Sequence, residues 1–218
     1  MTKEQLQRHV EFQLRNIMCA DIDCSAYISN AIDRTMVSLC AANNGYFSRM
    51  GGVPDVYHSV AYATFLYFLS NEMFVKDAGG INADKVYYLN KTLNGLEAFY
   101  ADELPSIFSM EHPFGTVLGR AKYGDYLFFY QGCTVGGSWL NDELYYPVIG
   151  EHVTMFSGSK ILGASNIGNH VIIAANTYII NCDIPDYSFV FPSVDGRNPK
   201  IVQGKKDAIL NREKNFWK

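Results

Sequence analysis

Residues 149–179 read IGEHVTMFSGSKILGASNIGNHVIIAANTYI, and one aliphatic residue recurs at every sixth position of this stretch. The recurring residues are Ile149, Met155, Ile161, Ile167, Ile173 and Ile179. A helix has a period of about 3.6 residues and a flat strand a period of about 2, so neither produces this spacing alone. A six-residue period with one aliphatic per unit is typical of a parallel β-helix, in which each unit is a short strand and a turn. The sequence therefore predicts that fold for its second half.

The repeat is less regular before this stretch. Val117, Tyr123, Phe129 and Val135 are again six residues apart, but Val135 and Ile149 are fourteen apart, two more than two units. The intervening GSWLNDELYYP (137–147) is therefore predicted to be a loop that projects from the solenoid. Insertions of this kind lie on one face, which is often the binding face.

The first half of the chain reads as helices. Apolar residues at helical spacing define two faces: Leu6, Val10, Leu14 and Ile17, and then Ile32, Met36, Val37 and Cys40. A third helix is expected to begin at the cap Asp55 and to run to about Phe74. A fourth is expected to begin at Asn82 or Asp84.

These patterns predict an α+β chain in three parts. Residues 1–106 form an α-helical domain, residues 107–190 the parallel β-helix, and residues 191–218 a C-terminal tail. The outer faces of a three-sided prism are flat, and packing against copies of itself would bury them. We therefore expect a homotrimer, or a dimer of trimers, with sites in the grooves between prisms.

Composition narrows the function classes. The 218 residues are 48% hydrophobic and 18% charged with a net charge of −4, so we expect no nucleic-acid partner, which would need a basic face. The apolar run 61–69 is too short to span a membrane, and the polar N-terminus lacks the apolar core of a signal peptide. Five cysteines without framework spacing predict buried free thiols in a cytoplasmic protein.

Five segments carry a resemblance to a known family. They are MEHPFGTVLG (110–119), CTVGG (133–137), Pro147, SGSKILG (157–163) and NPKIV (198–202). From Glu97 to Val202 the chain resembles the hexapeptide-repeat acyltransferases, and most closely the serine acetyltransferase type. The resemblance implies a left-handed parallel β-helix, acetyl-CoA as co-substrate, no metal, and direct transfer of acetyl to an acceptor hydroxyl.

The resemblance assigns catalytic roles to His112 and a carboxylate. His112 matches the general base of the family, and an imidazole pKa of about 6.5 suits that work. Without the motif, His112 would read as an ordinary exposed or core histidine. Glu97, fifteen residues earlier, matches the aspartate that orients the base. Asp102 and Glu103 are rivals for this role, and the alternative for Glu97 is a solvated charge at a helix end. Glu111 matches an aspartate that contacts the acceptor.

Small and basic residues match the coenzyme-binding positions of the family. They are Gly136, Gly137, Ser157, Gly158, Ala175 and Lys200. Glycines allow backbone N–H groups to approach a thioester closely, although a tight corner of the coil would also require them. Lys200 could meet the phosphates of the coenzyme, and the alternative is a solvated basic tail.

The chain departs from the family where the acceptor is held. Tyr145 and Tyr146 precede Pro147, where serine-acetylating members carry Arg-His, and Arg120 replaces a glutamate. A carboxylate is best held by a guanidinium fork, whereas a tyrosine ring suits a sugar. Tyr145, Tyr146 and Arg120 are therefore predicted to bind the acceptor, which is serine by resemblance or a sugar of a surface polysaccharide by these departures.

Two other classes compete with an O-acetyltransferase. A metal-dependent carbonic anhydrase on this fold would need two histidines about five residues apart with a third upstream. His112, His152 and His170 are forty and eighteen residues apart, so we expect no close pair. A non-catalytic β-helix scaffold is the other alternative, and it would not require the segments around His112 and Gly136 together.

Overall fold

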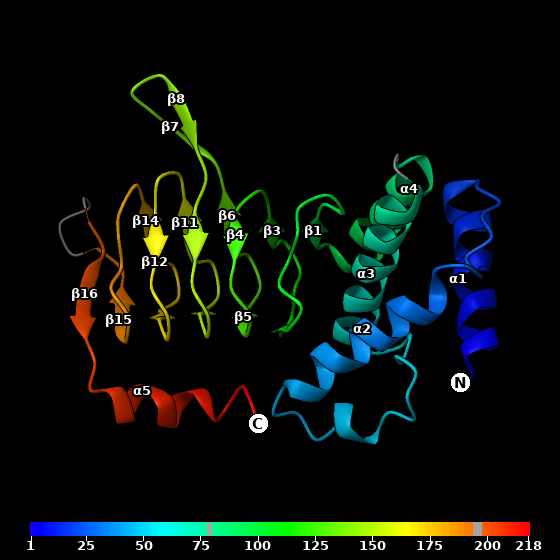
Figure 1. The fold of residues 1–218 in the computed structure, drawn as a ribbon, viewed down its shortest axis with the longest axis horizontal. Helices are drawn as coiled ribbons and strands as arrows, with labels where there is room; N and C mark the ends of the chain where they lie inside the picture. The colour runs from blue at the N-terminus through cyan, green and yellow to red at the C-terminus, as the bar shows by residue number, and fades with distance from the viewer. Residues whose placement is uncertain (78–79, 194–197) are drawn as a thin grey trace.

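The computed structural model describes residues 1–77, 80–193 and 198–218, in which helices and coils form two adjoining parts (Figure 1). The helices of the first half are α1 (Lys3–Met18), α2 (Ile28–Ala41), the short 3-10 helix η1 (Phe47–Arg49), α3 (Ser59–Asp77) and α4 (Ile81–Asn94). Helix α3 packs against both α2 and α4. Its side chains are buried on all sides from Val60 to Asn71, as expected for a helix at the centre of a bundle.

Four details of the helical half differ from expectation. Ile17 is exposed, and α4 begins at Ile81 after the cap residue Gly80, so neither Asn82 nor Asp84 caps it. Val37 and Cys40 are exposed, because α2 begins at Ile28 and turns Ala31 and Leu39 inward instead. Asp55 does not cap the third helix, which begins four residues later. Its carboxylate accepts the backbone N–H of Tyr57 at 2.9 Å.

Short parallel strands form the three faces of a left-handed β-helix. The first sheet contains β1 (Glu97–Ala98), β3 (Val117–Leu118), β6 (Thr134–Gly136), β11 (Lys160–Leu162) and β14 (Tyr178–Ile180). The second contains β2 (Phe108–Met110), β5 (Leu127–Phe129), β10 (Thr154–Met155), β13 (Ile172–Ile173) and β15 (Ser188–Phe191). The third contains β4 (Lys122–Tyr123), β9 (Val148–Ile149) and β12 (Asn166–Ile167).

The six-residue period of the sequence determines the register of the strands in these sheets. Ile161 lies beside Ile179 in the first sheet, and the corresponding residues of the other sheets are also eighteen positions apart, which is one full coil. All six recurring aliphatic residues are buried. Each face thus contributes one aliphatic side chain per coil to a continuous core, and the predicted fold is confirmed. The division at residues 106 and 107 stays a proposal, and β1 already pairs with β3 before it.

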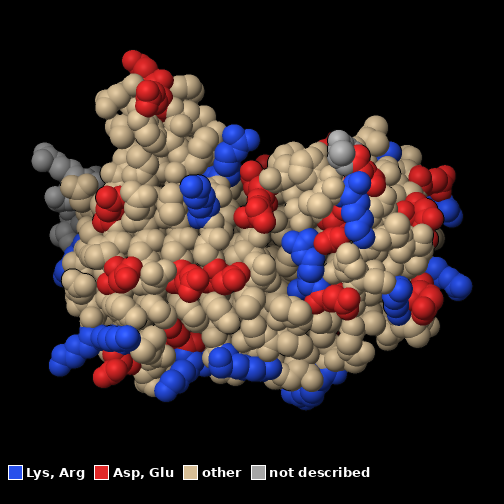
Figure 2. Space-filling model, in the orientation of Figure 1, with Lys and Arg blue, Asp and Glu red and all other residues tan. Residues whose placement is uncertain are grey.

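The insertion in the repeat is a β-hairpin. Strands β7 (Ser138–Leu140) and β8 (Glu143–Tyr145) pair antiparallel, and Asn141 and Asp142 join them with φ of 49° and 63°. Two successive left-handed residues are typical of the tight turn of a hairpin. Val135 and Ile149 lie on consecutive faces, so their spacing is one unit with eight extra residues, and the expectation of two units was wrong. The hairpin projects far beyond the coils, and acidic side chains mark its tip (Figures 1 and 2).

The residues after the last coil run back to the helical half. Strand β16 (Lys200–Gln203) pairs antiparallel with β15, and α5 (Lys206–Glu213) then follows the edge of the coils (Figure 1). Trp217 forms a bridge with Ala42, and the Lys218 N–H donates to the carbonyl of Ala41 at 3.1 Å. We call residues 205–218 the C-terminal strap, because they tie the far coils to the helices.

Two further expectations can be compared with the described residues. Among them, no helix has the length and apolar character needed to cross a bilayer. None of the five cysteines forms a disulfide; Cys24 and Cys133 are buried, whereas Cys19 and Cys40 are exposed. The expectation of buried thiols was therefore wrong for those two, which lie just beyond or near the ends of helices.

Candidate active site

His112 lies on an exposed turn at the start of the β-helix. It follows β2 and has a φ of 50°, and the left-handed Gly115 comes three residues later. A left-handed backbone is uncommon for a residue with a side chain, so the turn holds His112 in a special conformation. Within the described residues, the imidazole has no hydrogen bond or ion pair in this single chain. Its ring is open to solvent and to a substrate.

Glu97 is held by a lysine in this structure. Its carboxylate accepts from Lys91 Nζ at 2.6 Å, and this hydrogen bond raises the pKa of Lys91. Its backbone N–H donates to the carbonyl of Thr116 at 2.9 Å, which places Glu97 beside the end of the His112 turn. No hydrogen bond joins Glu97 to His112 among the described parts of the chain, so its role as the orienting carboxylate remains a proposal.

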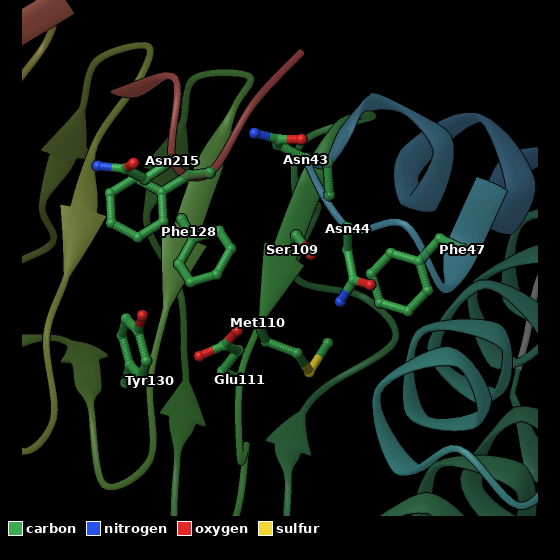
Figure 3. A pocket seen from close by; sticks show the side chains of 11 residues that line it. Asn43, Asn44, Phe47, Ser109, Met110, Glu111, Phe128, Tyr130 and Asn215 are labelled. Atoms are coloured by element: carbon green, nitrogen blue, oxygen red, sulfur yellow. The ribbon is translucent and has the colours of Figure 1, made fainter. Parts of the chain in front are cut away.

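Glu111 lines a cavity on the side of the β-helix that faces the strap. The cavity has a volume of about 270 Å³ and lies between β2, β5, the loop after α2 and the end of the strap (Figure 3). Its lining includes Asn43, Asn44, Glu111, Tyr130 and Asn215. Amide, hydroxyl and carboxylate groups therefore meet apolar walls in a space suited to a small polar molecule.

The carboxylate of Glu111 helps to raise the pKa of its neighbour Tyr130. Burial raises the pKa of Tyr130 to about 12, and the charge of Glu111 and a hydrogen bond to it add to this effect. The phenol is therefore a hydrogen-bond donor at neutral pH. Sequence reasoning identified Glu111 but missed Tyr130 and the asparagines, which come from segments more than eighty residues apart.

Arg120 and Tyr146 are brought together at the base of the hairpin. The guanidinium lies 5.2 Å from the centre of the Tyr146 ring, and its Nε is 4.0 Å from a carboxylate oxygen of Asp102. The Arg120 side chain is 70% exposed, whereas that of Asp102 is 15% exposed. Burial raises the pKa of Asp102, and the charge of Arg120 opposes this. The hydroxyl of Tyr145 instead donates to Glu143.

The residues that resemble coenzyme-binding positions fall into three places. Gly137 lies under the hairpin, where a Cβ would come within 3.0 Å of both Leu144 and Tyr146, so packing alone explains this glycine. Gly136 has open space, since the nearest atom to an added Cβ is 4.0 Å away.

Ser157, Gly158 and Ala175 lie at one corner of neighbouring coils. The carbonyl of Ser157 accepts the N–H of Asn176 at 2.9 Å, and Gly158 has a φ of 72°. Ala175 also lines a more apolar cavity of about 380 Å³ with Phe156 and Arg212. Lys200 is exposed on β16. In one chain, Ser157, Gly158 and Ala175 thus follow strands β10 and β13 of the second sheet. Strands β2 and β5 of the same sheet line the Glu111 cavity, one or more coils earlier.

Two histidines that are not close in the sequence lie close in space. The eighteen residues between His152 and His170 are one coil, so the two rings stack with centroids 4.8 Å apart. Residues eighteen positions apart in the sequence therefore lie next to each other on adjacent coils.

Comparison with known proteins agrees with this architecture. No family model matches the chain. A serine acetyltransferase of Staphylococcus xylosus is 28% identical over 130 residues, which are 59% of this chain and 59% of that protein. The chain thus aligns with about three fifths of the length of this curated relative.

Solved structures extend the likeness over nearly the whole chain. A serine acetyltransferase in complex with cysteine has a TM-score of 0.72 and 19% identity, and the match covers 93% of this chain and 80% of that one. A serine acetyltransferase in complex with CoA has a TM-score of 0.69 and 20% identity, covering 92% of this chain and 84% of that one. The chain is thus similar in sequence to serine acetyltransferases, and it shares their fold of a helical half followed by a left-handed parallel β-helix.

Proposed function

We propose that this protein is an O-acetyltransferase that uses acetyl-CoA and acts on the hydroxyl of serine. The observation that carries the proposal is the exposed, left-handed His112 within the EHPFGTVLG segment, at the point where the coils begin. The curated relatives and the solved structures are serine acetyltransferases, which supports the same activity. They lend no support to a sugar acceptor, nor to a scaffold without catalysis.

The proposed reaction needs one base and one oxyanion site. His112 takes the proton of the acceptor hydroxyl while its oxygen attacks the thioester carbon of acetyl-CoA. The tetrahedral oxyanion is stabilised by backbone N–H groups near Gly136. Its collapse breaks the carbon–sulfur bond, and the protonated His112 returns the proton to the departing thiolate. The products are an O-acetyl ester and free CoA.

The proposed orienter of His112 is Glu97. Its strand lies beside the residues that follow the histidine turn, but Lys91 holds its carboxylate at 2.6 Å. An exposed pair of this kind contributes little to stability, so the carboxylate can exchange partners at little cost. Glu97 would then orient the ring and stabilise its charged form.

Arg120 is our proposed ligand for the acceptor carboxylate. It replaces the arginine that serine-acetylating relatives carry just before the proline of the inserted loop. The face of Tyr146 supports its guanidinium, and the 4.0 Å separation from Asp102 leaves its donors available. Glu111 would meet the amino group of the acceptor, and Tyr145 would complete the outer wall.

For the coenzyme, we propose the corner formed by Ser157, Gly158 and Ala175. Small residues there leave room for a pantetheine arm, and Lys200 would meet the phosphates. Because the flat outer faces of a prism are suited to packing against copies of itself, we propose that the sites are completed between the prisms of a homotrimer or of a dimer of trimers. A cytoplasmic location stays a prediction from the cysteine usage.

The deciding experiment incubates the protein with acetyl-CoA and follows the release of free thiol. L-serine, simple sugars and nucleotide sugars are compared as acceptors. We expect turnover with serine, and a loss of about 10²–10⁴-fold in His112→Ala, the usual cost of losing a general base. His9→Ala is the matched control, because His9 lies in α1 against Tyr62. Full activity in His112→Ala would refute the mechanism, and turnover of a sugar alone would refute the acceptor.

A further inference from the structure

Two histidines and a glutamate meet at one corner of the β-helix. His152 and His170 occupy equivalent positions on consecutive coils, and both have a left-handed backbone, with φ of 56° and 57°. Glu213 comes from the last residue of α5 in the strap. The possible ligand atoms of the three side chains all lie within 4.8 Å of one another.

The two histidines share the single carboxylate unequally. His170 Nδ1 is 3.0 Å from both oxygens of Glu213, whereas His152 Nδ1 is 3.8 Å from the nearer one. His152 Nδ1 is buried and has no hydrogen-bond partner in the described chain. A buried polar atom without a partner is costly, so this nitrogen calls for an explanation.

The distances are close to those of a metal site. Ligand atoms at about 2.0–2.2 Å from a tetrahedral ion are about 3.4 Å apart, and the two His–Glu separations lie on either side of this value. Two imidazole nitrogens and one carboxylate form a donor set preferred by divalent transition metals such as zinc and cobalt. A fourth position would be left to water.

The stacking of the rings sets one condition on binding. The planes of His152 and His170 differ by only 14°, and a nitrogen lone pair lies in the plane of its ring. Each ring must therefore turn toward Glu213 to share one ion. The side chains are 25% and 21% exposed, which leaves a path for a hydrated ion.

Within the described part of the chain, the coils on either side of His152 and His170 contribute no histidine to this cluster. Tyr126 stacks on the outer face of His152, and Tyr187 stacks on the outer face of His170. The neighbouring coils therefore offer phenol rings where these two offer imidazoles. Lys206 lies over the ring of Tyr187, one step away from the cluster.

We propose that His152, His170 and Glu213 bind one divalent transition-metal ion, which fastens the C-terminal strap to the β-helix. The ion gives the unpartnered nitrogen of His152 a ligand bond and holds Glu213, which is 7% exposed, at the coil corner. Asn215 and Phe216, just beyond Glu213, line the Glu111 cavity, so the ion also steadies one of its walls. This site is separate from acetyl transfer, and its presence does not depend on the proposed function.

The test uses the full chain with Cys19→Ser and Cys40→Ser, because exposed thiols would themselves bind zinc. After treatment with a chelator and its removal, zinc chloride is titrated calorimetrically, and cobalt(II) binding is followed by its visible absorption. We expect one ion per chain. His152→Ala and Glu213→Gln should each weaken zinc binding about 100-fold or more, since even residues behind the ligands change affinity about 10–100-fold. His9→Ala should bind like the parent protein.

A second measurement separates an ion site from ordinary packing. Zinc at about a hundredfold excess over its dissociation constant should raise the melting temperature by about 5–10 °C in the parent and not in His152→Ala. Nδ1 of His152 has no hydrogen bond to lose among the described residues, so we expect this variant to remain folded and to decide the question even if His170→Ala does not fold. No saturable zinc binding, or binding unchanged in His152→Ala and Glu213→Gln, would overturn the proposal.

Discussion

Ile179 and Ile180 are adjacent in β14 and provide a matched test of the inward register. Ile179 is fully buried against Ile161, whereas Ile180 is 46% exposed on the outer face. The same substitution to alanine can therefore be made at both positions in one strand. If the six-residue period describes the core, the two variants must differ greatly in stability.

The expected losses follow from burial. Ile179→Ala removes three carbons, worth about 0.8 kcal/mol each, and leaves a cavity in the prism, which brings the loss to about 3–4 kcal/mol. Ile180→Ala removes only about half as much buried surface and leaves no closed cavity. We therefore expect it to lower the free energy of unfolding by about 1 kcal/mol. For a chain of this length, 1 kcal/mol shifts the melting temperature by about 2–4 °C. The buried variant should therefore melt about 6–16 °C lower than the parent, and the exposed one about 2–4 °C lower.

The assay is thermal unfolding by circular dichroism at two protein concentrations. A second subunit packed on this sheet would partly cover Ile180, and its contribution would change with concentration, unlike the loss in the core. Equal, concentration-independent losses for the two variants would refute the assignment of Ile179 to the core and Ile180 to the surface.

Four other outcomes are expected. Glu97→Gln should lower the turnover with serine less than His112→Ala does, because it removes only the orientation of the base; a larger loss would make Glu97 the essential group. Arg120→Ala should raise the KM for serine roughly 10- to 100-fold at unchanged KM for acetyl-CoA, since a hydrogen bond to a charged group is worth about 1.5–3 kcal/mol; an unchanged serine KM would exclude it as the carboxylate ligand. Light scattering should give three or six times the 24.5 kDa chain mass, and a single-chain mass at micromolar concentration would end the shared-site proposal. Burial lowers the pKa of His9 and of His58, although at His58 the charge of Asp55 opposes this effect. In acid, the unfolded chain therefore binds more protons than the folded chain. Stability should therefore fall as the pH drops below about 6.5, and replacing both histidines by asparagine should lessen that fall in the melting temperature.

The six-residue period could be recognised in the sequence because each face of every coil needs one aliphatic side chain that points into the core. The hairpin could also be located, since its eight extra residues break that period. The number of repeat units between Val135 and Ile149 could not be determined from the sequence. One unit with eight extra residues has the same length as two units with two extra residues. Helix faces were less certain, since α3 is buried on all sides and carries almost no periodic signal.

The site was only partly predictable for a related reason. His112, Glu111 and Arg120 are marked by local motifs, and the structure places each on an exposed turn or rim. Tyr130, Asn43 and Asn215 meet Glu111 only through the fold, and no short motif records this. The pair His152 and His170 carried a usable signal, since eighteen residues is three units of the repeat and therefore one coil.

The C-terminal strap has a consequence for how the chain folds during its synthesis. Neighbouring coils pair residues eighteen positions apart, such as Ile161 and Ile179, so each new coil can form on the one before it soon after it leaves the ribosome. The contact of Trp217 with Ala42 spans most of the chain, and contacts of long sequence separation form slowly because a large loop must first close. The edge of Ala42 and the corner of His170 therefore stay uncovered until residues 205–218 have emerged. The docking of the strap then follows the formation of the coils, and a nascent chain stalled before residue 205 would expose both surfaces to chaperones and proteases.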